Sequence, residues 1–280
     1  LNIEYSDRKG DFSYNFGLNL SGYKNELTEL HSVAYLGIPS SSLHNVNFDQ
    51  EVSRSTVGEP IASFFGYKAD GLFRSQQEVD AYGLQPNAQP GDIRFRDINN
   101  DGVINDEDRT YIGSPHPDLV LGLNVKLNYK NFDLGMFFNG NFGNDIYNLT
   151  KYKTQFFNQS AYNKDSSLLG AWTPENPNSD IARLSLDDAN NNIRPSSYYV
   201  ENGSYLKLNN LQLGFTLPEY VLSAANLRLY VQASSVFTIT DYSGMTPEIG
   251  LQDYSSSSRN LDIGGRPRNL STLKNIRIRI

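Results

Sequence analysis

The sequence LVLGLNVKLNYKNFDLGMFFNGNF, residues 119–142, decides the fold. Apolar residues occupy alternate positions on both sides of its centre, which predicts two β-strands with one apolar face each. A two-residue turn at 130–131, with Asn131 in a left-handed conformation, brings Tyr129 opposite Phe132. A slip of one residue would exchange the two faces, so the pattern fixes the register. The other expected pairs are Leu127 with Leu134, Val125 with Met136 and Leu123 with Phe138 on the apolar face, and Asn128 with Asp133, Lys126 with Gly135 and Asn124 with Phe137 on the polar face.

The same alternation recurs on both sides of this hairpin. It is present in residues 12–20, 211–217, 227–233 and 276–280. Together with the stretch from residue 1 to the turn at Asp7 to Gly10, these segments predict about seven antiparallel strands, each of about ten residues. The connections alternate in length: the short ones are Asp7 to Gly10, Lys130-Asn131 and Pro218 to Asn226, and the long polar ones are 24–118, 143–198 and 240–269.

This asymmetry of connections favours one all-β architecture. An antiparallel transmembrane β-barrel has short periplasmic turns and long extracellular loops, and its strands present apolar side chains to lipid and polar ones to the lumen. We therefore predict a segment of about seven strands of a larger barrel, with the three long connections outside the cell. A soluble β-sandwich, with its apolar face in a core, explains the alternation equally well but explains the loop asymmetry poorly.

Composition excludes several other classes. The chain has 280 residues, 24 basic and 31 acidic side chains, a net charge of −7 and no cysteine. The absence of cysteine excludes a disulfide scaffold and a cysteine-ligated zinc site. The acidic balance argues against nucleic acid as a partner. Mean hydropathy is −0.50, and no run approaches the roughly 18 apolar residues of a membrane helix.

One long connection contains a calcium-type loop. Residues 97–108 read DINNDGVINDED and match the twelve-residue calcium-binding pattern. Its flanks do not read as amphipathic helices, so we expect a structural Ca²⁺ site that fixes the loop. A metal-free cluster of Asx turns is the alternative. The candidate ligands are Asp97, Asn99, Asp101, the Val103 carbonyl, Asn105 and Asp108.

Several motifs together resemble the SusC/RagA-like TonB-dependent transporters of the Gram-negative outer membrane. They occur in the family's order across nearly the whole chain. The most specific one runs from Pro90 through the calcium-type loop to Pro115. The others are VGEPIASFFGY at 57–67 with DGLF at 70–73, GNFGNDIYN at 140–148, WTPENP at 172–177 and SSYYVENGSYL at 196–206.

This resemblance implies that residues 1–280 are the C-terminal part of a longer transporter. Members of the family have a 22-stranded barrel and an N-terminal plug that contacts TonB, and they import oligosaccharides or peptides. A SusD-like surface lipoprotein covers the barrel. The implied surroundings are outer-membrane lipid, and the plug is not found in this sequence. Ile280 departs from the aromatic residue that commonly ends such barrels.

Candidate binding residues lie in the loop 143–198 and on the polar strand faces. Aromatic side chains stack on sugars, but those of the loop can equally form its own core, which we consider the better interpretation. The loop aromatics are Tyr147, Tyr152, Phe156, Phe157, Tyr162 and Trp172, of which Tyr147, Tyr152, Phe156 and Trp172 are the candidate substrate contacts. The expected lumen-facing residues are Asn124, Lys126, Asn128, Asp133, Asn139, Gln212, Arg228 and Gln232; they could tune passage or contact the plug, but a solvated inner wall is the simpler interpretation.

Catalysis has little support in the sequence. The three histidines have no ligand spacing, and no G-x-S-x-G, P-loop or H-E-x-x-H motif is present. We therefore expect a transporter and not an enzyme. The main alternative is a secreted or surface β-sandwich that binds glycan and contains a structural calcium site. A calcium-dependent β-rich glycosidase is a third, weaker alternative, because no acid/base pair can be nominated.

Overall fold

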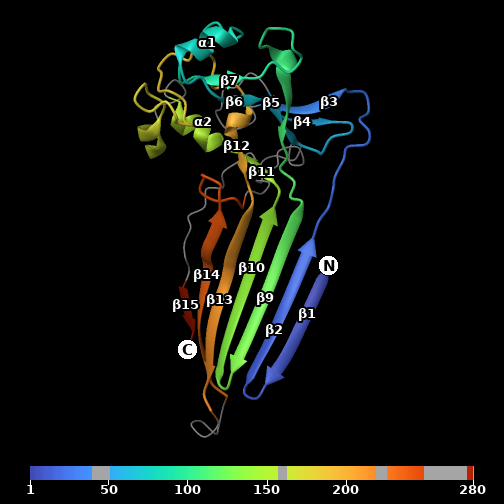
Figure 1. The fold of residues 1–280 in the computed structure, drawn as a ribbon. Coiled ribbons are helices and arrows are strands. Elements are labelled where there is room, and N and C mark those ends of the chain that lie inside the picture. Colours follow the sequence, from blue (N-terminus) through green and yellow to red (C-terminus); the bar gives the residue numbers. More distant parts are fainter. Residues whose placement is uncertain (40–50, 157–162, 219–225, 249–275, 280) are drawn as a thin grey trace.

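The computed structural model describes residues 1–39, 51–156, 163–218, 226–248 and 276–279. One long sheet extends below a more compact region built from the long connections (Figure 1). We call the first the main sheet. We call the second the cap, meaning the described residues within 22–118 and 143–204. No helix among the described residues is long and apolar enough to cross a membrane.

The main sheet contains seven strands, in agreement with the sequence prediction. Each strand pairs antiparallel with its neighbours in the order β1-β2-β9-β10-β13-β14-β15. Tight turns lie at one end and the long connections at the other (Figure 1). The strands are β1 (Asn2–Lys9), β2 (Phe12–Ser21), β9 (Leu119–Tyr129), β10 (Phe132–Phe142), β13 (Tyr205–Thr216), β14 (Arg228–Thr240) and β15 (Ile276–Arg279).

The β9–β10 hairpin has the predicted register along its whole length, from Tyr129 opposite Phe132 to Leu119 opposite Phe142. The prediction about its turn was wrong in one respect. Lys130 has the positive φ of 53°. Asn131 instead holds the next strand, because its side-chain amide donates to the Thr216 carbonyl at 2.7 Å.

Two other connections differ from their predicted positions or fall outside the structure. The first turn lies at residues 10–11 and not at 7–10, because β1 continues to Lys9 and Gly10 takes a φ of 61°. Residues 219–225 of the predicted turn 218–226, and residues 249–269 of the predicted loop 240–269, lie outside the described residues, as does Ile280.

The connections 24–118 and 143–198 contain regular structure of their own. They form a four-stranded sheet, β3-β4-β5-β8, and the two-stranded sheets β6-β7 and β11-β12. The elements are β3 (Tyr35–Pro39), β4 (Glu51–Thr56), β5 (Ser63–Tyr67), β6 (Ala69–Leu72), α1 (Gln76–Tyr82), β7 (Ile93–Phe95), β8 (Arg109–Gly113), β11 (Asp145–Tyr147), α2 (Leu149–Gln155) and β12 (Val200–Asn202), with 3₁₀ turns at Asp106–Asp108, Ser166–Gly170 and Ser197–Tyr199.

The buried hydrophobic clusters lie in the cap. The larger cluster joins residues of β4 to β8 with residues of β11, α2 and the 3₁₀ turn at 197–199, and the main sheet contributes no member to it. The smaller cluster is built around Phe73 next to α1. The other three sheets lie beyond one end of the main sheet and not across its face (Figure 1). The described residues therefore do not form the β-sandwich that was the alternative prediction.

Candidate functional site

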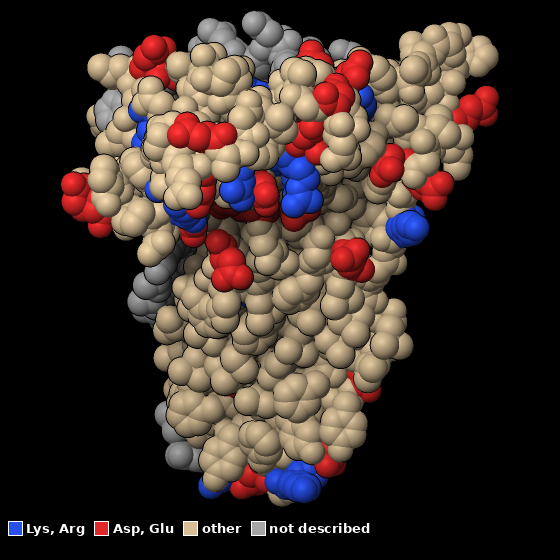
Figure 2. Space-filling view, turned by 45° about the horizontal axis from the view of Figure 1, so that its top comes forward, with Lys and Arg blue, Asp and Glu red and all other residues tan. Residues whose placement is uncertain are grey.

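One face of the main sheet presents apolar side chains to the surroundings. Tyr129, Phe132 and Leu213 are each more than half exposed, at 53%, 52% and 53%. Figure 2 shows a broad belt over the sheet that is largely free of charged side chains, with charges gathered above and below it. Monomeric soluble proteins rarely leave so continuous an apolar surface uncovered. This face therefore requires an apolar environment.

Aromatic residues form a row across this face at the turn end. The register places Phe12 opposite Tyr129, Tyr129 opposite Phe132, and Phe132 opposite Phe215, so the row crosses β2, β9, β10 and β13. The rings of Phe132 and Phe215 have centroids 4.7 Å apart. The exposed Lys130 lies in the turn just beyond the row. Aromatic rings next to charged turns are typical of a membrane–water interface.

The opposite face is polar. All eight residues predicted to face a lumen share it, because the register aligns Asn128 with Asp133, Gly135 with Gln212, and Gln212 with Gln232. Asn139 and Arg228 lie on the same face, opposite Lys207 and Thr216. A sheet with one exposed apolar face and one polar face can separate lipid from water.

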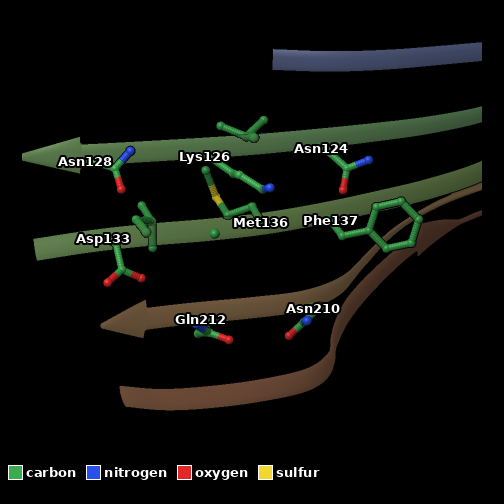
Figure 3. Close-up of a pocket in the computed structure, with 11 residues that line it drawn as sticks. Asn124, Lys126, Asn128, Asp133, Met136, Phe137, Asn210 and Gln212 are labelled. Atoms are coloured by element: carbon green, nitrogen blue, oxygen red, sulfur yellow. The ribbon is translucent and has the colours of Figure 1, made fainter. Parts of the chain in front are cut away.

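A shallow groove of about 270 Å³ lies on this polar face. Figure 3 shows Asn124, Lys126 and Asn128 along β9, and Asn210 and Gln212 along β13. Gly135 forms part of the floor, and a Cβ atom there would meet no atom within 4 Å. Phe137 adds an aromatic ring at one end. The groove offers amide groups, one ammonium group, one carboxylate and one ring, which is chemistry suited to binding a polar solute.

An ion pair borders the groove. Arg228 Nε donates to Asp133 Oδ1 at 2.9 Å, and its Nη2 lies 2.5 Å from Oδ2. The pair crosses β13 over Gly214, where a Cβ atom would come within 2.4 Å of Asp133 Oδ1. The glycine therefore makes room for a bidentate contact between β10 and β14. The charge of Asp133 is neutralised locally.

Sequence reasoning missed part of this site. Lys207 lies on the polar face because the pairing of β13 shifts register between Leu208 and Asn210. Asn210 lies two residues before Gln212 and shares its face by ordinary alternation. A signal was present: leucines at 206 and 208 are followed by the next leucine at 211, so the alternation changes phase. Such an extra residue is the mark of a β-bulge. Lys207 forms an ion pair with Glu248.

The calcium-type loop lies in the cap, between two strands and not between helices, as its flanks predicted. Asp97 Oδ1 and Oδ2 accept from the Asn100 and Gly102 amides at 2.6 and 2.9 Å. Asp101 Oδ1 accepts from Val103 N at 2.9 Å. Gly102 takes the sharp turn with a φ of 86°. These contacts fold the loop around the acidic side chains.

The last ligand position of the loop has a different surrounding. Asp108 is fully buried, and its two oxygens accept from the amides of Ile98 and Asn105 at 2.8 and 2.7 Å. Asn105 also begins the 3₁₀ turn by accepting from Glu107 N. Among the described residues, no group of three or more His, Cys, Asp or Glu side chains is arranged to hold a metal ion.

The aromatic candidates for substrate contact lie inside the cap. Tyr147, Tyr152 and Phe156 are 1%, 1% and 7% exposed and belong to the larger hydrophobic cluster, and Trp172 packs against it. Burial raises the pKa of Tyr152 to about 12. Their position agrees with the core role that the sequence favoured. Phe157 and Tyr162 lie outside the described residues.

Comparison with known proteins gives clear relatives, although no family model matches the chain. The chain is 34% identical to TonB-dependent receptor P3 of Formosa agariphila over 91% of its length. It is 33% identical to receptor P26 of the same organism over 86%. It is 25% identical to TonB-dependent receptor SusC of Bacteroides thetaiotaomicron over 85%. It spans about a quarter of each relative, 25%, 24% and 22%.

A solved structure has the same fold. The RagAB peptide transporter superposes with a TM-score of 0.67 at 21% identity, over 88% of this chain and 26% of that one. The same transporter in an open state gives a TM-score of 0.66. The match covers 88% of this chain, which is more than the main sheet or the cap contains alone. The similarity therefore includes residues of both.

Proposed function

Because the chain belongs to the SusC/RagA-like TonB-dependent transporters of the Gram-negative outer membrane, we propose that its main sheet is part of the wall of an outer-membrane importer. The observation that carries this proposal is that one face of the sheet is apolar, exposed and crossed by an aromatic row, while the other face of the same strands is polar. In this role the apolar face contacts lipid, and the polar face lines the passage.

The cap is then the extracellular part of this segment. The short turns lie beyond the aromatic row and face the periplasm, so the long connections extend outward at the other end. The larger hydrophobic cluster of the cap contains no residue of the main sheet. The proposed partners are TonB, through a plug elsewhere in the longer protein, and a SusD-like lipoprotein over the cap.

The cargo we propose is an oligosaccharide or a peptide. SusC-type relatives and the RagAB peptide transporter support these two classes in turn. Deleting the gene of the full-length protein should abolish uptake of one class of fluorescent oligomer by whole cells, and the intact gene should restore it. The full-length protein should also sediment with outer membranes and change mobility on gels when heated. A freely soluble protein would contradict the proposal.

We also propose that loop 97–108 binds a structural calcium ion. The residue spacing and the positive φ of Gly102 support it. Asp101 supports it as well, since hydrogen bonds from Asn99, and then from the Val103 amide, lower the pKa of its carboxyl and keep it ionised. Asp97, Asn99 and Asp101 with the Val103 carbonyl and Asn105 would hold the ion, and Asp108 would close the loop. Calcium would supply a fixed charge around which the loop folds.

Calorimetric titration tests the calcium proposal. The full-length protein should bind calcium in the millimolar range or tighter, and a double variant Asp97→Ala with Asp101→Ala should lose that binding. The variant Asp80→Asn removes one exposed carboxylate of α1, outside the loop, and should bind as the wild type does. If the wild type shows neither binding heat nor thermal stabilisation with calcium, the calcium proposal is wrong. The loop is then a metal-free cluster of Asx turns.

A further inference from the structure

The apolar face of the main sheet carries charged side chains at its turn end. By register, Lys9 lies opposite Phe12, so its side chain shares the apolar face with the aromatic row. The Lys130 ammonium lies 5.5 Å from the centroid of the Tyr129 ring, so it too lies beside the row. β1 and β9 are two strand spacings apart, about 10 Å. Two flexible lysine side chains can therefore reach one group placed between them, over β2.

An acidic side chain lies just beyond these two lysines. Asp11 belongs to the turn between β1 and β2, and its Oδ2 lies 4.0 Å from Lys130 Nζ, with both side chains more than half exposed. The two turns lie side by side, because the Lys130 amide donates to the Asp11 carbonyl at 3.2 Å. A molecule that lies along this face therefore meets apolar side chains first, then two ammonium groups, and then a carboxylate at the end of the sheet.

A second carboxylate of this face already has partners. Asp7 lies two residues inward from Lys9 on β1. Its oxygens accept from the Tyr14 hydroxyl at 3.1 Å and from the Arg8 amide at 2.7 Å. The formal charges at this end of the face sum to zero over Lys9, Lys130, Asp7 and Asp11. A ligand with separated charges and no net charge is therefore a better match than an anion.

From this order of charges, and resting on the proposed place of the sheet in a membrane, we propose that the turn end of β1, β2 and β9 binds a zwitterionic phospholipid that has a primary ammonium group. Its phosphate lies between Lys9 and Lys130, its ammonium donates to the Asp11 carboxylate, and its acyl chains follow the apolar face. A quaternary ammonium has no N–H to donate, and the Tyr129 ring, which could attract it, already has a cation beside it. Phosphatidylethanolamine should therefore bind better than phosphatidylcholine or the anionic phosphatidylglycerol.

Fluorescence quenching beside this headgroup site tests the inference. In a cysteine-free background of the full-length protein, Phe16→Cys carries a fluorophore on the apolar face, opposite Val125. Position 16 is four residues inward from Phe12, or about 13 Å. The protein is reconstituted in phosphatidylcholine vesicles that contain a minor fraction of one test lipid with brominated acyl chains: phosphatidylethanolamine, phosphatidylglycerol or phosphatidylcholine. Quenching should show about three-fold stronger binding of phosphatidylethanolamine than of the other two, the scale of one exposed ion pair.

Substitutions of Asp11 give the sharpest comparison. Asp11→Asn should make phosphatidylethanolamine and phosphatidylcholine equivalent, because the ammonium loses its charged acceptor. Asp11→Lys changes the summed charge from zero to plus two and should make phosphatidylglycerol the preferred lipid. Glu4→Gln removes a carboxylate from the polar face of β1 and should keep the wild-type order. A fluorophore at Phe237→Cys, on the apolar face near the cap, should report no dependence on Asp11.

The possible results separate this inference from the proposed function. Equal quenching by the three lipids in the wild type would overturn the inference, and so would a wild-type preference for phosphatidylglycerol or phosphatidylcholine. The wild-type order of lipids in either Asp11 variant would also overturn it. No quenching by any brominated lipid at position 16 would instead contradict the proposed function, because the apolar face would then not contact lipid.

Discussion

Leu211→Arg is expected to prevent assembly of the full-length protein in the outer membrane, whereas Gln212→Arg should assemble normally. Leu211 lies on the apolar face opposite Met136. It is four residues from Phe215 of the aromatic row, which is about 13 Å along a strand and about half of the roughly 25 Å apolar band of such barrels. Arginine at that depth costs about 2–4 kcal/mol. Gln212 points to the polar face, where arginine stays in water.

The two variants differ by one position in the same strand, so expression and charge are matched. The measurement is the fraction of protein in the outer membrane that shows heat-modifiable mobility. Arginine in the place of a partly exposed leucine on a solvated surface costs little in water-soluble proteins. Equal assembly of both variants would therefore mean that the apolar face does not contact lipid.

Tyr199→Ala is expected to unfold the cap while leaving the main sheet intact. Tyr199 is fully buried, and its ring lies 5.7 Å from Tyr147, 6.0 Å from Tyr152 and 5.4 Å from Tyr198 between centroids. It joins the two long connections through their common hydrophobic cluster. Removing a large buried aromatic side chain costs about 3–5 kcal/mol.

Hydrogen exchange read by mass spectrometry measures this prediction on the full-length protein. Exchange of cap peptides should accelerate by at least about a hundredfold, because each 1.4 kcal/mol corresponds to a factor of about ten. Peptides of β9 and β10 should not change. Tyr199→Phe is the control, since it keeps the buried ring and loses the hydroxyl that donates to the Asn192 carbonyl at 3.3 Å, a hydrogen bond worth about 1 kcal/mol. Equal acceleration in cap and sheet would contradict a separate core.

The sequence was sufficient for the main sheet because its information is local. Alternation with period two assigns the faces, and the tight turn at 130–131 fixes the register of β9 on β10 without help from distant residues. The positive φ of Lys130 was missed because asparagine adopts the left-handed conformation more readily than lysine, so the sequence favoured Asn131 for that position.

The cap could not be predicted in the same way. Its core joins residues as distant as Phe64 and Tyr199, and such contacts leave no periodic signal in either segment. Buried polar contacts share this property: Asp92 is fully buried and meets Arg183 at 2.6 Å across the two connections. Five of the residues predicted to face a lumen line the groove, but Lys207 reached the polar face only through the register shift in β13. Alternation in the sequence specifies on which face of a strand a side chain lies. Long-range packing specifies which distant side chains meet.

Lipid contact at two neighbouring positions tests the central claim most directly. Val231 is 48% exposed on the apolar face of β14, and Gln232 follows it on the polar face. In a cysteine-free background, Val231→Cys and Gln232→Cys are labelled with a polarity-sensitive fluorophore in the assembled full-length protein, and brominated lipid is added as quencher. The account predicts strong quenching at 231 and little at 232. Equal quenching at both positions, or none at 231, would contradict the assignment of this sheet to a membrane wall.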